Sequence, residues 1–162
     1  MQNLQNNNVE EIVEKYGDML YRICYVLLKN SSDAEDTVQE TIIKYIERKP
    51  VLKDVEHTKA WLITVAKNKC MDLIRNRKRY ENIEIGNIIE MLEEPINTEI
   101  LEVLMSLPEK IRLVLVLYYV EEYQVKEIAK IINKTQSAVK MRLQKGRRLL
   151  REKYESEVQD NV

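Results

Sequence analysis

The chain has 162 residues, of which 44% are hydrophobic and 33% are charged, a composition that predicts a folded globular protein and excludes a disordered one. Its single histidine excludes catalytic and metal sites that need two or more histidines, and no apolar run is long enough to span a membrane. The formal net charge of −1, if spread evenly, argues against nucleic acid as a partner. Residues 1–8 lack the pattern of a signal peptide, so we expect a cytoplasmic protein with two reduced, buried cysteines.

Apolar residues recur at the spacing of a helix throughout the chain. One stripe runs from Ile12 to Leu27 and a second from Trp61 to Ile74, and the pattern continues beyond Leu113. Three glycines and three prolines leave few of the tight turns that a β-rich fold requires. The sequence therefore predicts an all-α fold of two small helical domains joined by a linker, the C-terminal one a helix-turn-helix.

Residues 33–40, with the sequence DAEDTVQE, are predicted to form the acidic first turns of a helix. Carboxylates are favourable there because the N-terminal end of a helix carries a partial positive charge. Taken alone, the pattern leaves two interpretations open. It is either a capped and solvated helix start or an acidic face that docks on a basic surface of a partner protein.

Charge is segregated along the chain rather than spread evenly. Residues 81–109 contain eight acidic side chains and no basic one, and they include the helix-interrupting Gly86 and Pro95. We expect a domain at residues 8–80, an acidic linker at 81–97 and a second domain at 98–156. A basic cluster in residues 67–79, interrupted by one acid, ends the first domain; it consists of Lys67, Lys69, Arg75, Arg77, Lys78 and Arg79.

The second domain carries the signature of a helix-turn-helix. A helix starting near Pro108 is followed by a short amphipathic helix at residues 125–132 and by a long basic helix from Gln136 to about residue 154. In the turn between the last two, Asn133 tolerates the left-handed conformation and Thr135 is suited to cap the next helix. Residues 134–153 hold eight basic side chains and one acid, which favours entry of this helix into a DNA major groove.

Four groups of motifs, in the right order, resemble bacterial sigma factors. The resemblance covers roughly residues 8–155, and with the short length the chain is identified as a member of the extracytoplasmic-function (ECF) group of the sigma-70 family. The matching segments are DAEDTVQET at 33–41, KAWLITVAKN at 59–68 with DLIRNRKR at 72–79, LPEKIR at 107–112, and EIA at 127–129 with VKMRL at 139–143.

The resemblance implies that the chain joins core RNA polymerase, touching its β subunit and the clamp helices of its β′ subunit. It also implies control by an anti-sigma factor, and it implies no cofactor, no metal and no catalytic residue. The free chain is expected to be a monomer, because no apolar helix is left over for a dimer interface. The residues implied to contact the clamp helices are Asp33, Glu35, Asp36, Gln39 and Glu40.

The resemblance also assigns two DNA elements. The helix from Trp61 to Arg79 would lie along the promoter −10 element and place the basic cluster on phosphates, and the loop around Glu47 to Glu56 would capture a flipped base as melting begins. On the −35 element, base edges are assigned to Lys140, Met141, Gln144 and Lys145, and phosphates to Arg142, Arg147 and Arg148.

Two other classes of function stay open on the sequence alone. A helix-turn-helix regulator that acts without joining polymerase shares the C-terminal motif, although such proteins usually dimerise on palindromic sites. An interaction protein whose helices are held by another chain is the second. The near-neutral total charge further predicts weak DNA binding by the free chain, with promoter affinity emerging on the polymerase.

Overall fold

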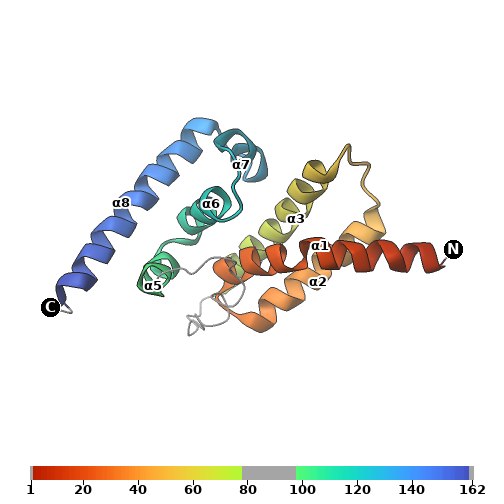
Figure 1. The fold of residues 1–162 in the computed structure, drawn as a ribbon, viewed down its shortest axis with the longest axis horizontal. Coiled ribbons are helices and arrows are strands. Elements are labelled where there is room, and N and C mark those ends of the chain that lie inside the picture. The colour runs from red at the N-terminus through yellow and green to blue at the C-terminus, as the bar shows by residue number, and fades with distance from the viewer. Residues whose placement is uncertain (1, 78–97, 161–162) are drawn as a thin grey trace. The chain divides into compact units, whose positions relative to one another are not determined.

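The computed structural model describes residues 2–77 and 98–160, and the regular elements in these ranges are all α-helices (Figure 1). The chain divides into two compact units, Met1–Asn82 and Ile83–Val162, which are described separately below. The predicted all-α fold is confirmed. The predicted acidic linker, residues 81–97, lies outside the described residues.

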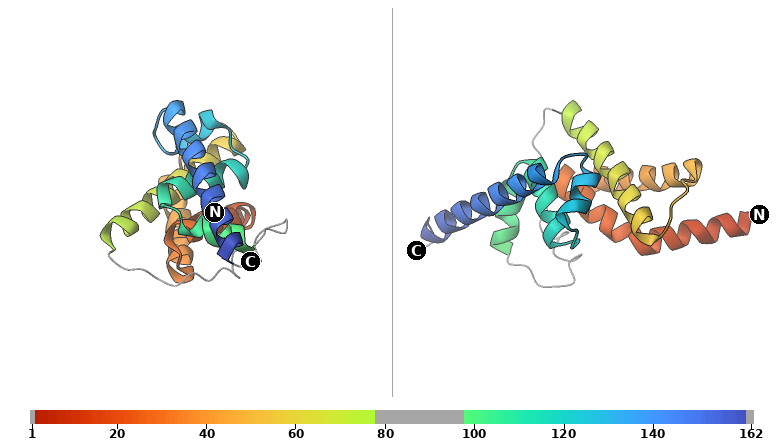
Figure 2. Two further views of the ribbon diagram at one scale, coloured as in Figure 1. Left: turned by 90° about the vertical axis from the view of Figure 1, so that its left-hand side faces the viewer. Right: turned by 90° about the horizontal axis from the view of Figure 1, so that it is seen from above.

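The first unit contains three helices, α1 (Gln2–Leu28), α2 (Ser31–Arg48) and α3 (Val55–Asn76), each packed against the other two (Figures 1 and 2). Helix α2 turns its small side chains inward, since Ala34, Thr37 and Thr41 are buried. The core of the unit is completed from α1 and α3 by Leu20, Ile23, Cys24, Tyr25, Leu62, Ile63, Ala66 and Cys70.

Packing of α1 on α3 brings the two cysteines together. Cys24 and Cys70 are both free thiols with no exposed surface, and their side chains share a hydrogen bond. This hydrogen bond, together with burial, raises the pKa of the Cys70 thiol far above its usual range. Because the thiolate is the reactive form, the Cys70 thiol is unreactive. The burial of both cysteines agrees with the prediction from the sequence.

Side-chain caps define the two connections of the first unit. Asn30 caps α2 by accepting a 2.8 Å hydrogen bond from the Asp33 amide. Lys49 ends α2 in the left-handed conformation, and Asp54 caps α3 by accepting from the His57 amide at 2.9 Å. The connection between α2 and α3 is therefore limited to residues 49–54. The prediction of a loop from Glu47 to Glu56 is wrong at both ends, because α2 continues to Arg48 and α3 already begins at Val55.

The second unit contains α5 (Thr98–Ser106), α6 (Glu109–Tyr119), α7 (Val125–Ile131) and α8 (Gln136–Asp160). Helix α6 packs against α7 and α8, and α5 packs against α8. Residues 111–117 of α6 are all buried, so side chains on every side of this helix contribute to the core of the unit.

A charged side chain lies inside this core and secures the corner between α5 and α6. The guanidinium of Arg112 is buried, and its Nη1 donates hydrogen bonds to the carbonyl oxygens of Met105 and Leu107, at 2.9 and 2.7 Å. Burial lowers the pKa of Arg112 to about 10, so the group stays charged at neutral pH. It satisfies carbonyls that the end of α5 leaves without intrahelical partners.

The turn between α7 and α8 has the local geometry expected from its sequence. Asn133 adopts a φ of 52°, in the left-handed region, and Lys134 donates its amide to the Ala129 carbonyl at 2.9 Å. Thr135 accepts a 3.1 Å hydrogen bond from the Ala138 amide through Oγ1, capping α8. The predictions for Asn133 and Thr135 are confirmed, and the helix-turn-helix has the order that the sequence indicates.

Gly146 sets how closely α8 approaches α6. A β-carbon at this position would lie 2.9 Å from a methyl carbon of Leu115 and 3.0 Å from one of Ile111. Both of those side chains are buried in α6, so a larger side chain at position 146 has to push the two helices apart.

We predict that Gly146→Val lowers the free energy of unfolding by about 1–3 kcal/mol, the usual cost of overpacking. Urea denaturation followed by circular dichroism measures the change. Gln144→Val introduces the same β-branched side chain at an exposed position of α8 and is the matched control. Equal stability of the two variants would contradict the close approach.

Candidate nucleic-acid and protein interfaces

Helix α8 presents one exposed, basic face opposite its buried face. Val139, Leu143 and Gly146 are buried against the rest of the unit. With 3.6 residues per turn, Met141, Lys145 and Arg148 follow each other along the opposite side. All three are exposed, and Met141 is 70% exposed, so its apolar side chain is accessible to a partner on this face.

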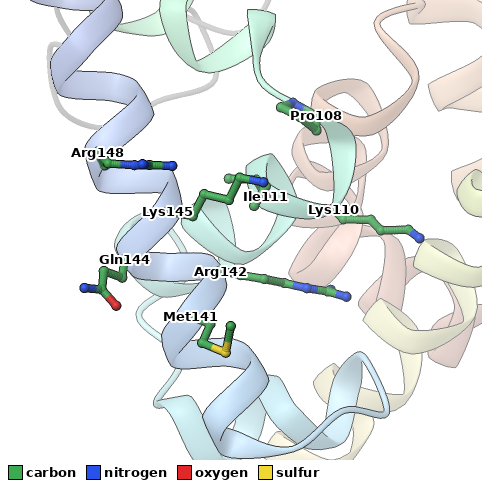
Figure 3. A pocket seen from close by; sticks show the side chains of 8 residues that line it. All are labelled: Pro108, Lys110, Ile111, Met141, Arg142, Gln144, Lys145 and Arg148. Carbon is green, nitrogen blue, oxygen red and sulfur yellow. The ribbon is translucent and has the colours of Figure 1, made fainter.

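A groove of about 610 Å³ lies between this face and the start of α6 (Figure 3). Lys145 and Arg148 extend from α8 toward α6, and the Lys145 side chain points toward Ile111. Four of its side chains are cationic, so the groove is basic with an apolar floor. It is lined by Pro108, Lys110, Ile111, Met141, Arg142, Gln144, Lys145 and Arg148.

Lys110 is the one cationic residue of this groove that the sequence did not assign to DNA. It is exposed in the first turn of α6 and lines the same groove as the predicted −35 residues of α8. The LPEKIR motif contains Lys110 but does not mark it as a DNA contact, since only the packing of α6 on α8 brings it beside residues far along the chain. Lys140, another residue predicted to contact the −35 element, is exposed at the side of this face and does not line the groove.

Arg147 differs from the other basic residues of α8 because it lies against aromatic rings of α6. Its Nε donates a 2.6 Å hydrogen bond to the Tyr119 hydroxyl, and its guanidinium lies 5.8 Å from the ring centres of both Tyr118 and Tyr119. The two rings themselves meet edge to face. A phosphate has to compete with these contacts for Arg147.

In the first unit, the acidic residues of α2 occupy its outer side. Glu35, Asp36, Gln39 and Glu40 are exposed, whereas Asp33 is half-buried at the edge nearest the end of α3. The structure thus brings together all five residues predicted to contact polymerase, four of them on one solvent-facing surface. Such a surface is available to a basic partner.

The basic residues of α3 differ in how far they reach solvent. Arg75 is exposed and forms a 3.3 Å ion pair with Asp72 in its own helix. Lys67 is half-buried, and burial lowers the pKa of its amine. Lys78 and Arg79, the last two predicted −10 residues, lie outside the described residues.

Two ion pairs connect acidic residues of α2 with Lys69, in the C-terminal half of α3, and with Arg77, the residue that follows α3. The Arg77 guanidinium pairs with the Asp33 carboxylate, and Lys69 Nζ lies 2.7 Å from Glu40 Oε2. The side-chain hydrogen bond from Arg77 holds the pKa of Asp33 below its usual range, which keeps this carboxyl ionised at neutral pH. Residues predicted to bind DNA are thereby paired with residues predicted to bind polymerase.

The connection between α2 and α3 exposes apolar surface. Val51 is fully exposed, and Val55 is about half exposed at the start of α3. Beside them His57 is exposed and its Nδ1 lies 2.7 Å from the Asp54 carboxylate, while Trp61 packs edge-on against Tyr45 of α2. Sequence reasoning did not select Val51 as a site residue, although an apolar residue after a proline in a loop is a usable signal.

Neither a metal site nor a membrane span is found in the described part of the chain. No group of three or more His, Cys, Asp or Glu side chains there is arranged to hold an ion. None of its helices is both long and apolar enough to cross a membrane.

Family models and relatives agree on the class of protein that these units form. Residues 12–80 match the model of sigma-70 region 2, and residues 97–150 match that of sigma-70 region 4. SigM of Bacillus subtilis, an ECF RNA polymerase sigma factor, is 32% identical over 94% of this chain and 98% of its own length. SigW of the same organism, also an ECF sigma factor, is 29% identical over 87% of this chain and 86% of its own.

Solved structures show the same fold. RpoE of Bartonella quintana, crystallised with the anti-sigma factor NepR, has a TM-score of 0.72 at 19% identity, covering 91% of this chain and 97% of that one. CnrH, solved with the cytosolic domain of CnrY, has a TM-score of 0.69 at 20% identity, covering 93% and 90%. The chain combines sigma-70 regions 2 and 4, and it is therefore a sigma-70 family protein. Within that family it belongs to the ECF group.

Proposed function

We propose that this ECF sigma factor binds core RNA polymerase through α2 and reads promoter DNA through α3 and α8. The −10 element is assigned to the first unit, and the −35 element to the second. The loop at residues 49–54 starts duplex melting by holding a flipped base, with the exposed Val51 as its apolar contact. The two domains correspond to residues 8–80 and 98–156, joined by the acidic linker at 81–97.

The observation that carries the proposal is the exposed face of α8, the helix that follows the capped turn of the helix-turn-helix. Met141 and Lys145 stand in the middle of that face, where they suit contacts with base edges. Arg142 lies at the side of this face and Arg148 lies further along it, and both are assigned to phosphates. The rings of Tyr118 and Tyr119 hold Arg147, so we assign it a weaker role at the rim.

The polymerase contact rests on the outer side of α2. Glu35, Asp36 and Gln39 are exposed there, so a basic helix pair on the partner, such as the β′ clamp helices, can approach them directly. The alternative of a regulator that acts without polymerase is not favoured, because residues 12–80 match region 2 of sigma factors.

Membership of the ECF group supports three further proposals, which concern location and activity, oligomeric state, and control. The chain acts as an initiation factor in the cytoplasm and not as an enzyme, and it is a monomer when free. An anti-sigma factor controls it by covering the surfaces just described. This assignment is supported by two structural neighbours, the first solved with an anti-sigma factor and the second with the cytosolic domain of CnrY.

Run-off transcription tests the whole proposal. Purified core polymerase is given a pool of promoter templates with and without this protein, and we expect specific transcripts only with it. Transcripts that do not depend on the protein, or none at all with a pool that related ECF factors transcribe, would contradict the proposed function.

We predict that Asp36→Arg and Glu40→Arg each abolish association with core polymerase in a pull-down, because each places a positive charge against a basic partner surface. Both residues are exposed, so the variants should remain folded by circular dichroism. Glu14→Arg makes the same charge reversal on the exposed side of α1 and is the control. Normal core binding by the α2 variants would remove the docking assignment.

We predict that Lys145→Ala weakens promoter binding by the holoenzyme by about 1–3 kcal/mol and relaxes the preference at one −35 position. Electrophoretic mobility shifts on promoters that vary at single −35 positions measure both effects. Arg151→Ala removes one exposed positive charge further along α8 and calibrates the general electrostatic loss. A loss that is uniform over all sequences would reassign Lys145 to a phosphate.

A further inference from the structure

We propose that the ion pairs Asp33–Arg77 and Glu40–Lys69, the α2–α3 ion pairs, make polymerase binding and DNA binding by the first unit favour each other. In the free chain, two of the acids that dock on polymerase hold two of the cations that bind the −10 element. When basic groups of polymerase take over the acids, Arg77 and Lys69 become available to phosphates. This inference rests on the proposed function and concerns how its two surfaces are regulated.

The placement of the pairs makes this competition unavoidable. Asp33 lies in the first turn of α2 and Glu40 two turns later, whereas their partners come in the reverse order along α3. The two pairs are therefore about 10 Å apart along antiparallel helices and connect the edges of both surfaces. A cation held by a carboxylate cannot at the same time give its full charge to a phosphate.

The remaining charges of the two helices show that the pairing is selective. Arg75 pairs within α3 with Asp72, so it does not connect the surfaces. Asp36 lies between Asp33 and Glu40 on α2 and forms no ion pair in the described part of the chain. Asp36 is therefore the control for the two acids, and Arg75 is the control for the two cations, because neither takes part in the α2–α3 ion pairs.

The size of the effect follows from the exposure of the pairs. The Asp33 and Arg77 side chains are 21% and 35% exposed, and Lys69 and Glu40 are 29% and 62% exposed. Pairs at this depth are weak to moderate, so each is expected to change a binding constant by about two- to five-fold. Coupling of this kind is reciprocal, so loss of the cation should favour polymerase as loss of the acid favours DNA.

The first arm of the test uses the free full-length chain and no polymerase. Fluorescence anisotropy at low salt measures its affinity for a labelled single-stranded DNA oligonucleotide of random sequence. Asp33→Asn and Glu40→Gln should each tighten binding about two- to five-fold more than Asp36→Asn, which changes the charge equally without removing a pair. In an Arg77→Gln background, Asp33→Asn should have no effect beyond that of Asp36→Asn.

Three results in this arm overturn the inference. They are equal effects of Asp33→Asn and Asp36→Asn, an excess effect of Asp33→Asn that persists without Arg77, and no detectable DNA binding by any of the variants. Because polymerase is absent, none of these results bears on whether the chain is a sigma factor, which the run-off transcription assay decides.

The second arm measures binding to core polymerase in the absence of DNA. Arg77→Gln should tighten this binding about two- to five-fold more than Arg75→Gln, because only the former releases an acid of α2. Equal effects of the two variants would show that the pairs do not couple the surfaces, even if the chain binds polymerase normally.

Discussion

The close packing of α8 on α6 at Gly146 is the constraint that fixes which face of α8 is exposed. Because no β-carbon separates the helices there, α8 can lie directly on the side chains of Leu115 and Ile111. That contact fixes the rotation of α8 about its own axis, and rotation decides which side chains face outward. Met141 and Lys145 are presented to solvent because Val139 and Leu143 are held in the core. The side chains that we propose to read DNA are thus oriented by an apolar contact on the other side of the helix.

The first unit uses the same principle with small polar side chains. Thr37 and Thr41 of α2 are buried, and the Thr41 hydroxyl donates a 2.7 Å hydrogen bond to the Thr37 carbonyl, so its burial leaves no polar atom unsatisfied. With these residues inside, the carboxylates of α2 have only the outer side available. The arrangement concentrates negative charge on one surface while the same helix keeps two acids within reach of α3. A single helix therefore carries both the surface proposed to bind a partner protein and the acids that pair with Lys69 and Arg77.

Local chemistry could be predicted from the sequence, and contacts across helices could not. Asn133 and Thr135 were assignable because a left-handed residue and a helix cap are decided by neighbours in the chain. The exposed face of α8 follows equally from helical periodicity. The pairing of Asp33 with Arg77, the contact of Arg147 with Tyr119 and the meeting of Cys24 with Cys70 join residues distant in sequence. Periodicity says which side of a helix is buried, but it does not say which helix covers it.

The position of the only tryptophan gives the molecule a built-in optical probe. Trp61 packs edge-on against Tyr45 inside the first unit, next to the connection assigned to strand separation. Indole emission therefore reports the environment of α3, while far-ultraviolet circular dichroism sums the helices of both units. Where the two signals change at different denaturant concentrations, the units unfold separately, and where they coincide, unfolding is a single cooperative event. Trp61 thus allows the energetic independence of the two units to be measured without a label.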